Sequence, residues 1–286
     1  MISLQPILPF LFVFLWSTGF VGAKFGLPYA EPLSFLLTRY GFVITLMLAI
    51  ALATRAPWPK EPMQWVHIGV SGILVQAVYL GGVFVAIKHG LPAGVTALVV
   101  GIQPLLTALG AGWLLDEKVS KRQWGGLALG FVGVGLVVSG KFGDAPLGPM
   151  LIPALVALLG ITAGTLYQKR YCAKLDLRTG SVIQFVPTAV LTAIAVALFE
   201  DYKIEWTGEF AFALGWLVLV LSLGAISLLN LLIRSGSAVN VASLFYLTPP
   251  MTALIAWVVF GENLTYTAAF GMVVAVSGVY LVAKPK

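Results

Sequence analysis

Long apolar segments alternate with short polar ones along almost the whole chain. A helix needs roughly 20 apolar residues to cross the core of a bilayer, and ten segments of about that length occur, near residues 6–27, 32–54, 64–88, 92–115, 121–140, 147–170, 178–200, 209–234, 238–260 and 265–284. The strict alternation of transmembrane β-strands is absent from the sequence. The pattern predicts an all-α polytopic membrane protein with ten transmembrane helices.

The composition agrees with this prediction. Apolar residues make up 59% of the 286 residues and charged residues 10%, with a mean hydropathy of +0.99, whereas soluble domains carry about 25% charged residues. The net charge of +6 is spread over short loops, with no basic stripe interleaved with aromatic residues, so we expect no nucleic-acid partner. The first apolar segment has no basic residues before it, which favours a retained helix over a cleaved signal peptide.

One sequence pattern occurs twice, 145 residues apart. The stretch QPLLTALGAGWLLDEKVSKRQWGG at 103–126 is followed by TPPMTALIAWVVFGENLTYTAAFG at 248–271. The residues that match at this offset include Pro104 and Pro249, Thr107 and Thr252, Glu117 and Glu262, Gly19 and Gly164, and Gly133 and Gly278. Apolar helices rich in small residues also match by chance, but proline, threonine and glutamate matching at one offset without gaps argue against chance.

The repeat divides the chain into a first half, residues 1–143, and a second half, residues 144–286, with five helices each. Because five is odd, the second half enters the membrane from the opposite side, and the two halves are predicted to be inverted repeats. Inverted repeats recur in secondary transporters, which bind substrate near the midplane between the repeats.

Lysines and arginines near helix ends predict the orientation, since they favour the cytoplasmic side. With the N-terminus inside, twelve fall on the cytoplasmic side, four fall outside and Arg39 falls within a span. Both termini are therefore expected to be cytoplasmic.

Residues that would mark cofactor or ion chemistry are scarce. The sequence has one cysteine, Cys172, two histidines, His67 and His89, and no P-loop, so we expect no disulfide, no metal centre, no cofactor and no ATP-driven pump. Every acid lies in or beside a predicted loop. Ion coupling through a central carboxylate is therefore not visible in the sequence, and facilitated movement of a substrate down its gradient is at least as favoured as ion-coupled transport.

Polar residues inside the predicted spans indicate a cavity. Arg39 is the one basic residue clearly within a span, and a charge there is by default a functional candidate, the alternative being a structural partner of a carbonyl or acid. Residues three or seven apart share a helix face, and pairs with this spacing are Gln76 with Tyr79, Thr96 with Gln103, and Ser243 with Tyr246. Interhelical hydrogen bonding is the alternative for each pair.

Prolines and a central tryptophan extend this picture. Pro104, and Pro249 with Pro250, follow the polar faces within their spans, where a freed backbone carbonyl is tolerated beside a wet cavity. They are expected to act as hinges. Trp16 falls mid-span beside Ser17 and Thr18, where it would line a pocket or pack against lipid or another helix.

FLWSTGFVGAKFGLPYAEPLSFLLTRYGFV, residues 14–43, resembles the opening of the EamA-type proteins of the drug/metabolite transporter superfamily. The two stretches that run from a proline through a glutamate to a glycine-rich helix resemble the ending of each half in that family. Within the family, the aromatic residues in the spans are most similar to those of YddG-type exporters of aromatic amino acids.

The resemblance implies ten helices, alternating access and export of small metabolites across the inner membrane. It selects as substrate-binding candidates Trp16, Arg39, Gln76, Tyr79, Gln103 and Tyr246, and gives Glu117 and Glu262 structural roles. We therefore expect an inner-membrane, multi-pass exporter of small amphipathic metabolites, preferably aromatic or hydrophobic amino acids, in which a monomer suffices. The alternatives are export of a purine, a sugar nucleotide or a drug in the same fold, and less favoured, a membrane enzyme or a channel.

Overall fold

Helices make up nearly all of the described chain. The computed structural model describes residues 7–91, 93–139, 148–149, 151–173, 175–261 and 264–284. In chain order the helices are α1 (Leu8–Gly26), α2 (Pro32–Ala53), α3 (Pro62–Gly72), α4 (Gly81–Lys88), α5 (Ala93–Val100), α6 (Gln103–Leu114), α7 (Lys121–Val138), α8 (Leu151–Tyr171), α9 (Leu177–Phe199), α10 (Gly208–Trp216), α11 (Ile226–Ser235), α12 (Ala238–Ser243), α13 (Thr248–Phe260) and α14 (Tyr266–Ala283).

Prolines and hydroxyl side chains begin most of these helices. Proline occupies the first turn of α1, α2, α3 and α6, where its missing N–H has no intrahelical partner to lose. Ser120, Thr207, Ser237 and Thr265 each accept a backbone N–H at the start of the helix that follows. Local sequence therefore determines where the helices start.

Eight helical segments of the described chain are long and apolar enough to cross a membrane: Pro32–Ala53, Pro62–Lys88, Val95–Leu114, Leu151–Tyr171, Leu177–Phe199, Gly208–Ser235, Ala238–Val259 and Tyr266–Ala283. The protein is thus an all-helical, multi-pass membrane protein. The other two predicted spans coincide with α1, which contributes the shorter apolar stretch Leu8–Gly19, and with α7. The count of ten spans stays a prediction.

Four predicted spans are not single α-helices. The segments 64–88 and 209–234 each contain a π-helical stretch, η2 (Ile73–Leu80) and η4 (Leu217–Ala225), whose last residues lie 145 positions apart. The segment 92–115 is interrupted between α5 and α6, and 238–260 contains a 3₁₀ turn, η5 (Leu244–Leu247). Hydropathy does not distinguish these variants, because they differ from an α-helix in backbone hydrogen bonding and not in composition.

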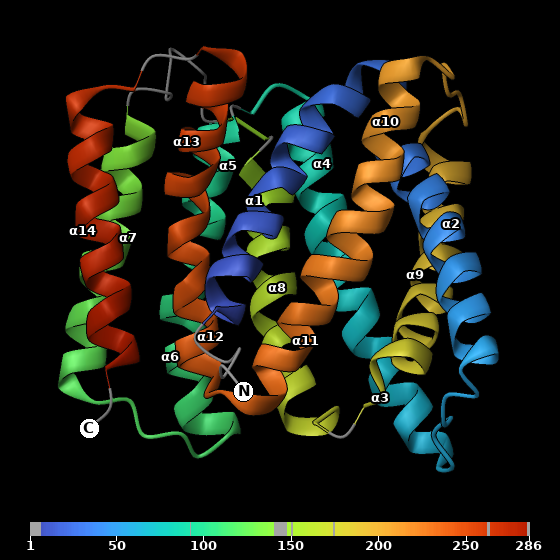
Figure 1. Ribbon diagram of the computed structural model, residues 1–286, viewed down its shortest axis with the longest axis horizontal. Coiled ribbons are helices and arrows are strands. Elements are labelled where there is room, and N and C mark those ends of the chain that lie inside the picture. The colour runs from blue at the N-terminus through green and yellow to red at the C-terminus, as the bar shows by residue number, and fades with distance from the viewer. Residues whose placement is uncertain are drawn as a thin grey trace.

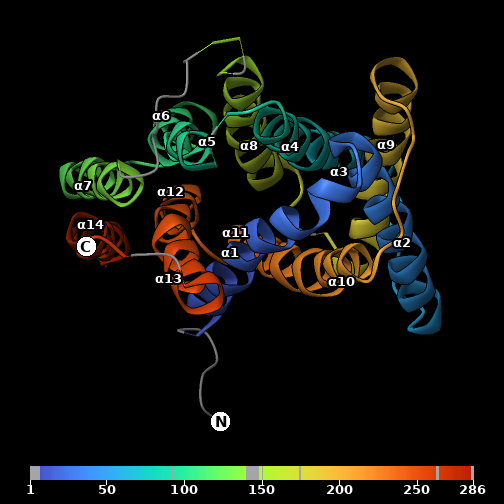
Figure 2. The same cartoon turned by 90° about the horizontal axis from the view of Figure 1, so that it is seen from above.

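Glycines allow α1 and α8 to approach the two π-helical stretches closely. A Cβ on Gly160 of α8 would lie 3.0 Å from the carbonyl oxygen of Leu74 in η2, and one on Gly19 of α1 would lie 2.9 Å from the side chain of Leu221 in η4. Small residues drive such helix pairs together in membranes. Because α8 packs on η2 and α1 packs on η4, the first helix of each half contacts the third segment of the other half. Figure 2 shows this interleaved arrangement from above.

The last helices of the two halves, α7 and α14, form a separate pair at one side of the molecule (Figure 2). Gly126 and Gly133 of α7 face α14, and Gly271 and Gly278 of α14 face α7, so closely that a Cβ on any of the four would overlap the backbone of the other helix. The pair lies away from the bundle formed by α1, α2, α8 and α9 (Figures 1 and 2).

Two glutamates hold helix N-termini across the boundary between the halves. Glu200 accepts hydrogen bonds from the backbone N–H groups of Leu33 and Ser34 at the start of α2, at 2.9 and 2.8 Å. Glu117 accepts one from Ala238 at the start of α12, at 3.0 and 3.1 Å to its two oxygens. A carboxylate is favoured there because the N–H groups lack partners and the helix dipole is positive. Glu117 thus has a structural contact, and Glu262 lies outside the described residues.

The packing of α7 against α14 predicts a strong position effect within one helix. Gly133→Ala should lower the free energy of unfolding by about 1–3 kcal/mol, since the added Cβ would lie 2.3 Å from the backbone nitrogen of Ala275. Gly125→Ala, in the same helix but with nothing within 4 Å, should be neutral or stabilising. Thermal unfolding of both variants in detergent micelles measures the difference, and equal midpoints would contradict this packing.

Candidate functional site

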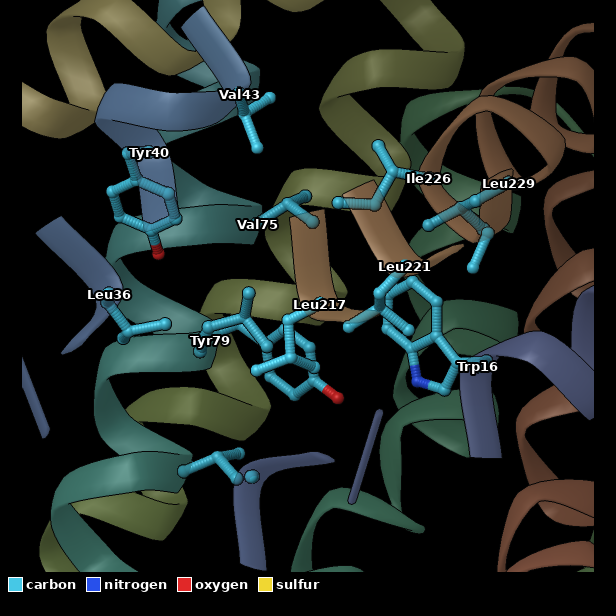
Figure 3. Packing of buried hydrophobic residues seen from close by; sticks show 14 of the residues in the cluster. Trp16, Leu36, Tyr40, Val43, Val75, Tyr79, Leu217, Leu221, Ile226 and Leu229 are labelled. Atoms are coloured by element: carbon cyan, nitrogen blue, oxygen red, sulfur yellow. The ribbon is translucent and has the colours of Figure 1, made fainter. Parts of the chain in front are cut away.

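An aromatic cluster lies where α1 meets η2 and η5. The indole of Trp16 is stacked on the ring of Tyr79, with centroids 6.4 Å apart and planes 11° apart. The rings of Phe245 and Trp16 form a T-shaped pair, with centroids 5.3 Å apart. Trp16 is 5% exposed and Tyr79 2% exposed, and Figure 3 shows both side chains among the buried residues of α2, η2 and η4. The cluster therefore offers flat apolar faces inside the bundle.

A cavity of about 120 Å³ adjoins this cluster. It is lined by Trp16, Tyr79, Val83, Thr96, Ala97, Val100, Gly101, Val137, Val138, Phe245, Thr248, Pro249, Thr252 and Ala253. An apolar protein cavity of about 150 Å³ holds benzene, so the volume suits a ring-sized apolar group. The lining comes from both halves and lies beside the interruptions of 92–115 and 238–260.

The few polar groups of the cavity are hydroxyls. The side-chain oxygens of Thr248 and Thr252 are buried without a hydrogen-bond partner, while the backbone oxygen of Thr248 accepts from Ser17 at 3.3 Å. An unpartnered buried hydroxyl is unfavourable, so each of these is suited to hydrogen bonding with a bound molecule or water. Among the residues that the structure describes, the cavity lining contains no Asp or Glu.

The structure brings only part of the predicted set together. Trp16, Tyr79 and the proposed hinge residue Pro249 line the cavity. The candidates that do not line it are Arg39, Gln76, Gln103, Tyr246, Pro104 and Pro250. The roles of all of them remain predictions.

Arg39 lies deep in α2 and is fully buried, at 0% exposure. Its Nε donates to Ser222 Oγ of η4 at 3.0 Å, and its Nη1 and Nη2 have no partner. Ser222 Oγ in turn donates to the carbonyl oxygen of Leu217 at 3.1 Å. The guanidinium therefore lies at the contact between α2 and η4 with two nitrogens unused.

Gln76, Gln103 and Tyr246 are buried in three other places. Gln103 donates to Thr107 at 3.1 Å, a contact within α6. The backbone oxygen of Gln76 accepts from the Tyr40 hydroxyl at 2.8 Å. The ring of Tyr246 packs in a second hydrophobic cluster between α7 and α12, so close to Gly130 that a Cβ there would lie 2.4 Å from it. Each has one side-chain oxygen without a partner.

Several residues at the site are not among the candidates predicted from the sequence. Phe245 and Thr248 lie next to candidates in the sequence, and Thr252 lies one turn after Pro249, so proximity to the helix interruption is the signal that would have found them. Two buried amide contacts were also missed, Gln168 with Asn230 at 2.6 Å and Gln184 with Ser71 at 3.0 Å. Both support the alternative of interhelical hydrogen bonding for polar residues within spans.

A second cavity, of about 330 Å³, lies where the α2–α3 and α8–α9 connections meet. Its lining includes Lys60, Glu61, Asp176 and Cys172. Hydrogen bonds from Arg178 hold the pKa of the Asp176 carboxyl below its usual value. Within the described part of the chain, no group of three or more His, Cys, Asp and Glu residues is placed to hold a metal ion.

The fold and the first cavity together define a class, a polytopic helical membrane protein with a buried, aromatic-lined space between its two halves. The comparison with known proteins gives the family. The chain belongs to the EamA-like transporter family, which it matches over residues 5–139 and again over residues 148–284.

Relatives of nearly the same length are transporters. The chain is 27% identical to the transporter YvbV of Bacillus subtilis, over 94% of this chain and 88% of the relative. It is 27% identical to the inner membrane transporter YedA of Escherichia coli, over 99% and 92%. It is also 27% identical to a probable amino-acid metabolite efflux pump of Salmonella typhimurium, over 96% and 93%. Family and relatives indicate a transporter and not an enzyme.

A solved crystal structure has the same fold. It superposes with a TM-score of 0.79 at 22% sequence identity, and covers 97% of this chain and 95% of its own. This likeness establishes the fold alone.

Cys172, which lines the second cavity, is predicted to be unreactive. Cys172 is 4% exposed, and burial raises the pKa of its thiol to about 11, so at pH 8 about one thousandth of it is the reactive thiolate. N-ethylmaleimide should label Cys172 at least about a hundredfold more slowly than an exposed cysteine, with the rate rising as the pH approaches 11. A Lys118→Cys, Cys172→Ser variant gives the exposed reference, and comparable rates at pH 8 would contradict this burial.

Proposed function

We propose that this protein exports small amphipathic metabolites, preferably aromatic or hydrophobic amino acids, by alternating access through a central cavity between two inverted repeats. The observation that carries the proposal is the cavity of about 120 Å³, whose aromatic wall combines Trp16 and Tyr79 of the first half with Phe245 of the second. A site with walls from both halves changes its access when one half moves relative to the other.

The proposed architecture is ten transmembrane helices in two inverted five-helix repeats, residues 1–143 and 144–286. Four observations support it: the family match occurs twice, the π-helical stretches end 145 residues apart, α1 and α8 exchange partners between halves, and α7 pairs with α14. The first helix begins and the last helix ends at the same end of the bundle (Figure 1). This supports both termini on one side, which the distribution of basic residues makes the cytoplasm.

The interruptions near Pro104 and near Pro249 and Pro250 are the proposed hinges. Pro104 lies in the first turn of α6, and the two later prolines follow the 3₁₀ turn η5 at the start of α13. Hinges are short irregular stretches between rigid elements. These two border the cavity through Gly101 and Pro249, so bending there would change its shape.

The apolar, aromatic lining and the name of the Salmonella relative favour amino acids among possible substrates. A purine, a sugar nucleotide or a drug is the alternative within the same fold. A membrane enzyme or a channel is less favoured, since the family and relatives are transporters. A monomer in the lipid bilayer is expected to suffice, because the cavity is formed within one chain.

Transport in proteoliposomes tests the proposal. Purified protein should take up labelled phenylalanine and show counterflow, in which unlabelled substrate on the far side accelerates uptake. Trp16→Ala should lower uptake at least about tenfold, because a buried aromatic–aromatic contact and its packing are lost. Trp113→Ala is the matched control, since Trp113 is 85% exposed on α6, and should retain uptake.

Each contrary result has a distinct meaning for this proposal. No uptake of any amino acid across a panel, with and without a pH gradient, would reject amino-acid export. Uptake without counterflow would favour a channel. Equal uptake by the two tryptophan variants would show that the cavity is not part of the transport pathway.

A further inference from the structure

Arg39 is a buried cation without a buried anion. Its side chain is 0% exposed, and within the part of the chain that the structure describes no carboxylate forms an ion pair with it. Arginine does not lose its proton in proteins, and a buried charge is strongly unfavourable unless it is paired. Something that is not part of the described chain is therefore expected to face it.

The unused nitrogens of Arg39 form one edge of the guanidinium. Nε is engaged by Ser222, and because the Ser222 hydroxyl donates its proton to Leu217, the serine serves only as an acceptor here. Nη1 and Nη2 remain without partners. Two adjacent guanidinium nitrogens match the two oxygens of a carboxylate, so the free edge has the geometry of a carboxylate receptor.

The second half shows that the fold does not need a charge at this position. The residue 145 positions after Arg39 is Gln184, which is 2% exposed. Gln184 of α9 donates to Ser71 of α3 at 3.0 Å, just as Arg39 of α2 donates to Ser222 of η4. Each residue joins the second helix of one half to the third segment of the other through a serine. In the second half a neutral amide makes the equivalent contact with a serine. The contact with Ser222 therefore does not account for the positive charge of Arg39.

The acids nearest to Arg39 along the helices are already engaged. Glu200 binds the N-terminus of α2, and Glu31 lies 3.6 Å from Lys88. Arg39 follows Pro32 by seven residues, which places it about 10 Å further along the helix axis. Within the residues that the structure describes, no acid is placed to balance Arg39, so we expect the balancing anion to come from a bound molecule.

We infer that the contact between α2 and η4 at Arg39 is a carboxylate-binding subsite, separate from the lining of the aromatic cavity, and that the transported molecule is an amphipathic carboxylate. The carboxylate of the substrate is required and its amine is not, because the described residues of the cavity lining provide no acid to pair with an ammonium group. Naming the ligand as transported substrate rests on the proposed function, whereas binding of a carboxylate at Arg39 does not.

Two probes with the same ring and opposite charge test this inference, 3-phenylpropionate and phenethylamine. The former should raise the thermal unfolding midpoint of the purified protein in a saturable manner, and the latter should not. Arg39→Gln should lower the apparent affinity for 3-phenylpropionate at least tenfold, and Arg39→Lys should lower it less. Gln184→Ala, the matched variant in the second half, should leave that affinity within threefold of the unaltered protein.

The midpoint without ligand separates a binding role from a structural one. Arg39→Gln should raise it by a few degrees, because a neutral side chain of the kind already present at residue 184 replaces an unpaired buried charge. If Arg39 were only structural, the same variant would lower the midpoint.

Three binding results would overturn the subsite. They are equal stabilisation by phenethylamine, an affinity for 3-phenylpropionate unchanged in Arg39→Gln, and no response to 3-phenylpropionate, which would mean that water alone satisfies the guanidinium. Transport measurements keep the two proposals apart. Binding of 3-phenylpropionate at Arg39 without transport of any probe would reject export and retain the subsite. Transport of phenethylamine as fast as phenylalanine would retain export and reject the subsite.

Discussion

The close approach of α1 to η4 and of α8 to η2 is the constraint on which the rest of the structure depends. Lipid does not force helices together as water does, so contact between backbones through small residues has to supply the association. Gly160 brings the backbone of α8 against that of η2, and Gly19 lets the side chain of Leu221 in η4 lie against the backbone of α1. Because each crossing joins one half to the other, neither half has its packing partners without its counterpart, and the space between them becomes a shared cavity.

The same interleaving explains why buried polar side chains cluster at the boundary between the halves. Arg39 with Ser222 and Gln184 with Ser71 each join helices of different halves. In the membrane interior a polar group without a partner is costly, so such contacts select one arrangement of the two halves. Those that are incomplete, at Arg39 above all, are the places where we propose that a transported molecule contributes the missing partner.

Hydropathy predicted the helical segments well, because crossing a bilayer imposes length and apolar character on each of them. It did not predict η2 and η4, which lie against Gly160 of α8 and Gly19 of α1. A π-helical stretch differs from an α-helix in its backbone hydrogen bonds and not in its composition. Spacing also identified residues that share a face without showing which neighbour that face meets. Tyr246 therefore packs against α7, while Phe245, next to it in the chain, contacts Trp16.

The central claim is that the two halves move relative to each other around a shared cavity. Cysteines are introduced in pairs in a Cys172→Ser background and carry spin labels. One pair replaces Lys118 and Ser235 at one end of the bundle, and the other replaces His89 and Lys203 at the opposite end. Each pair gives one distance between the halves. Pulsed electron–electron double resonance should show the two distances changing in opposite directions when a saturating amphipathic carboxylate is added. Two distances that stay constant, or that increase together, would contradict alternating access through this cavity.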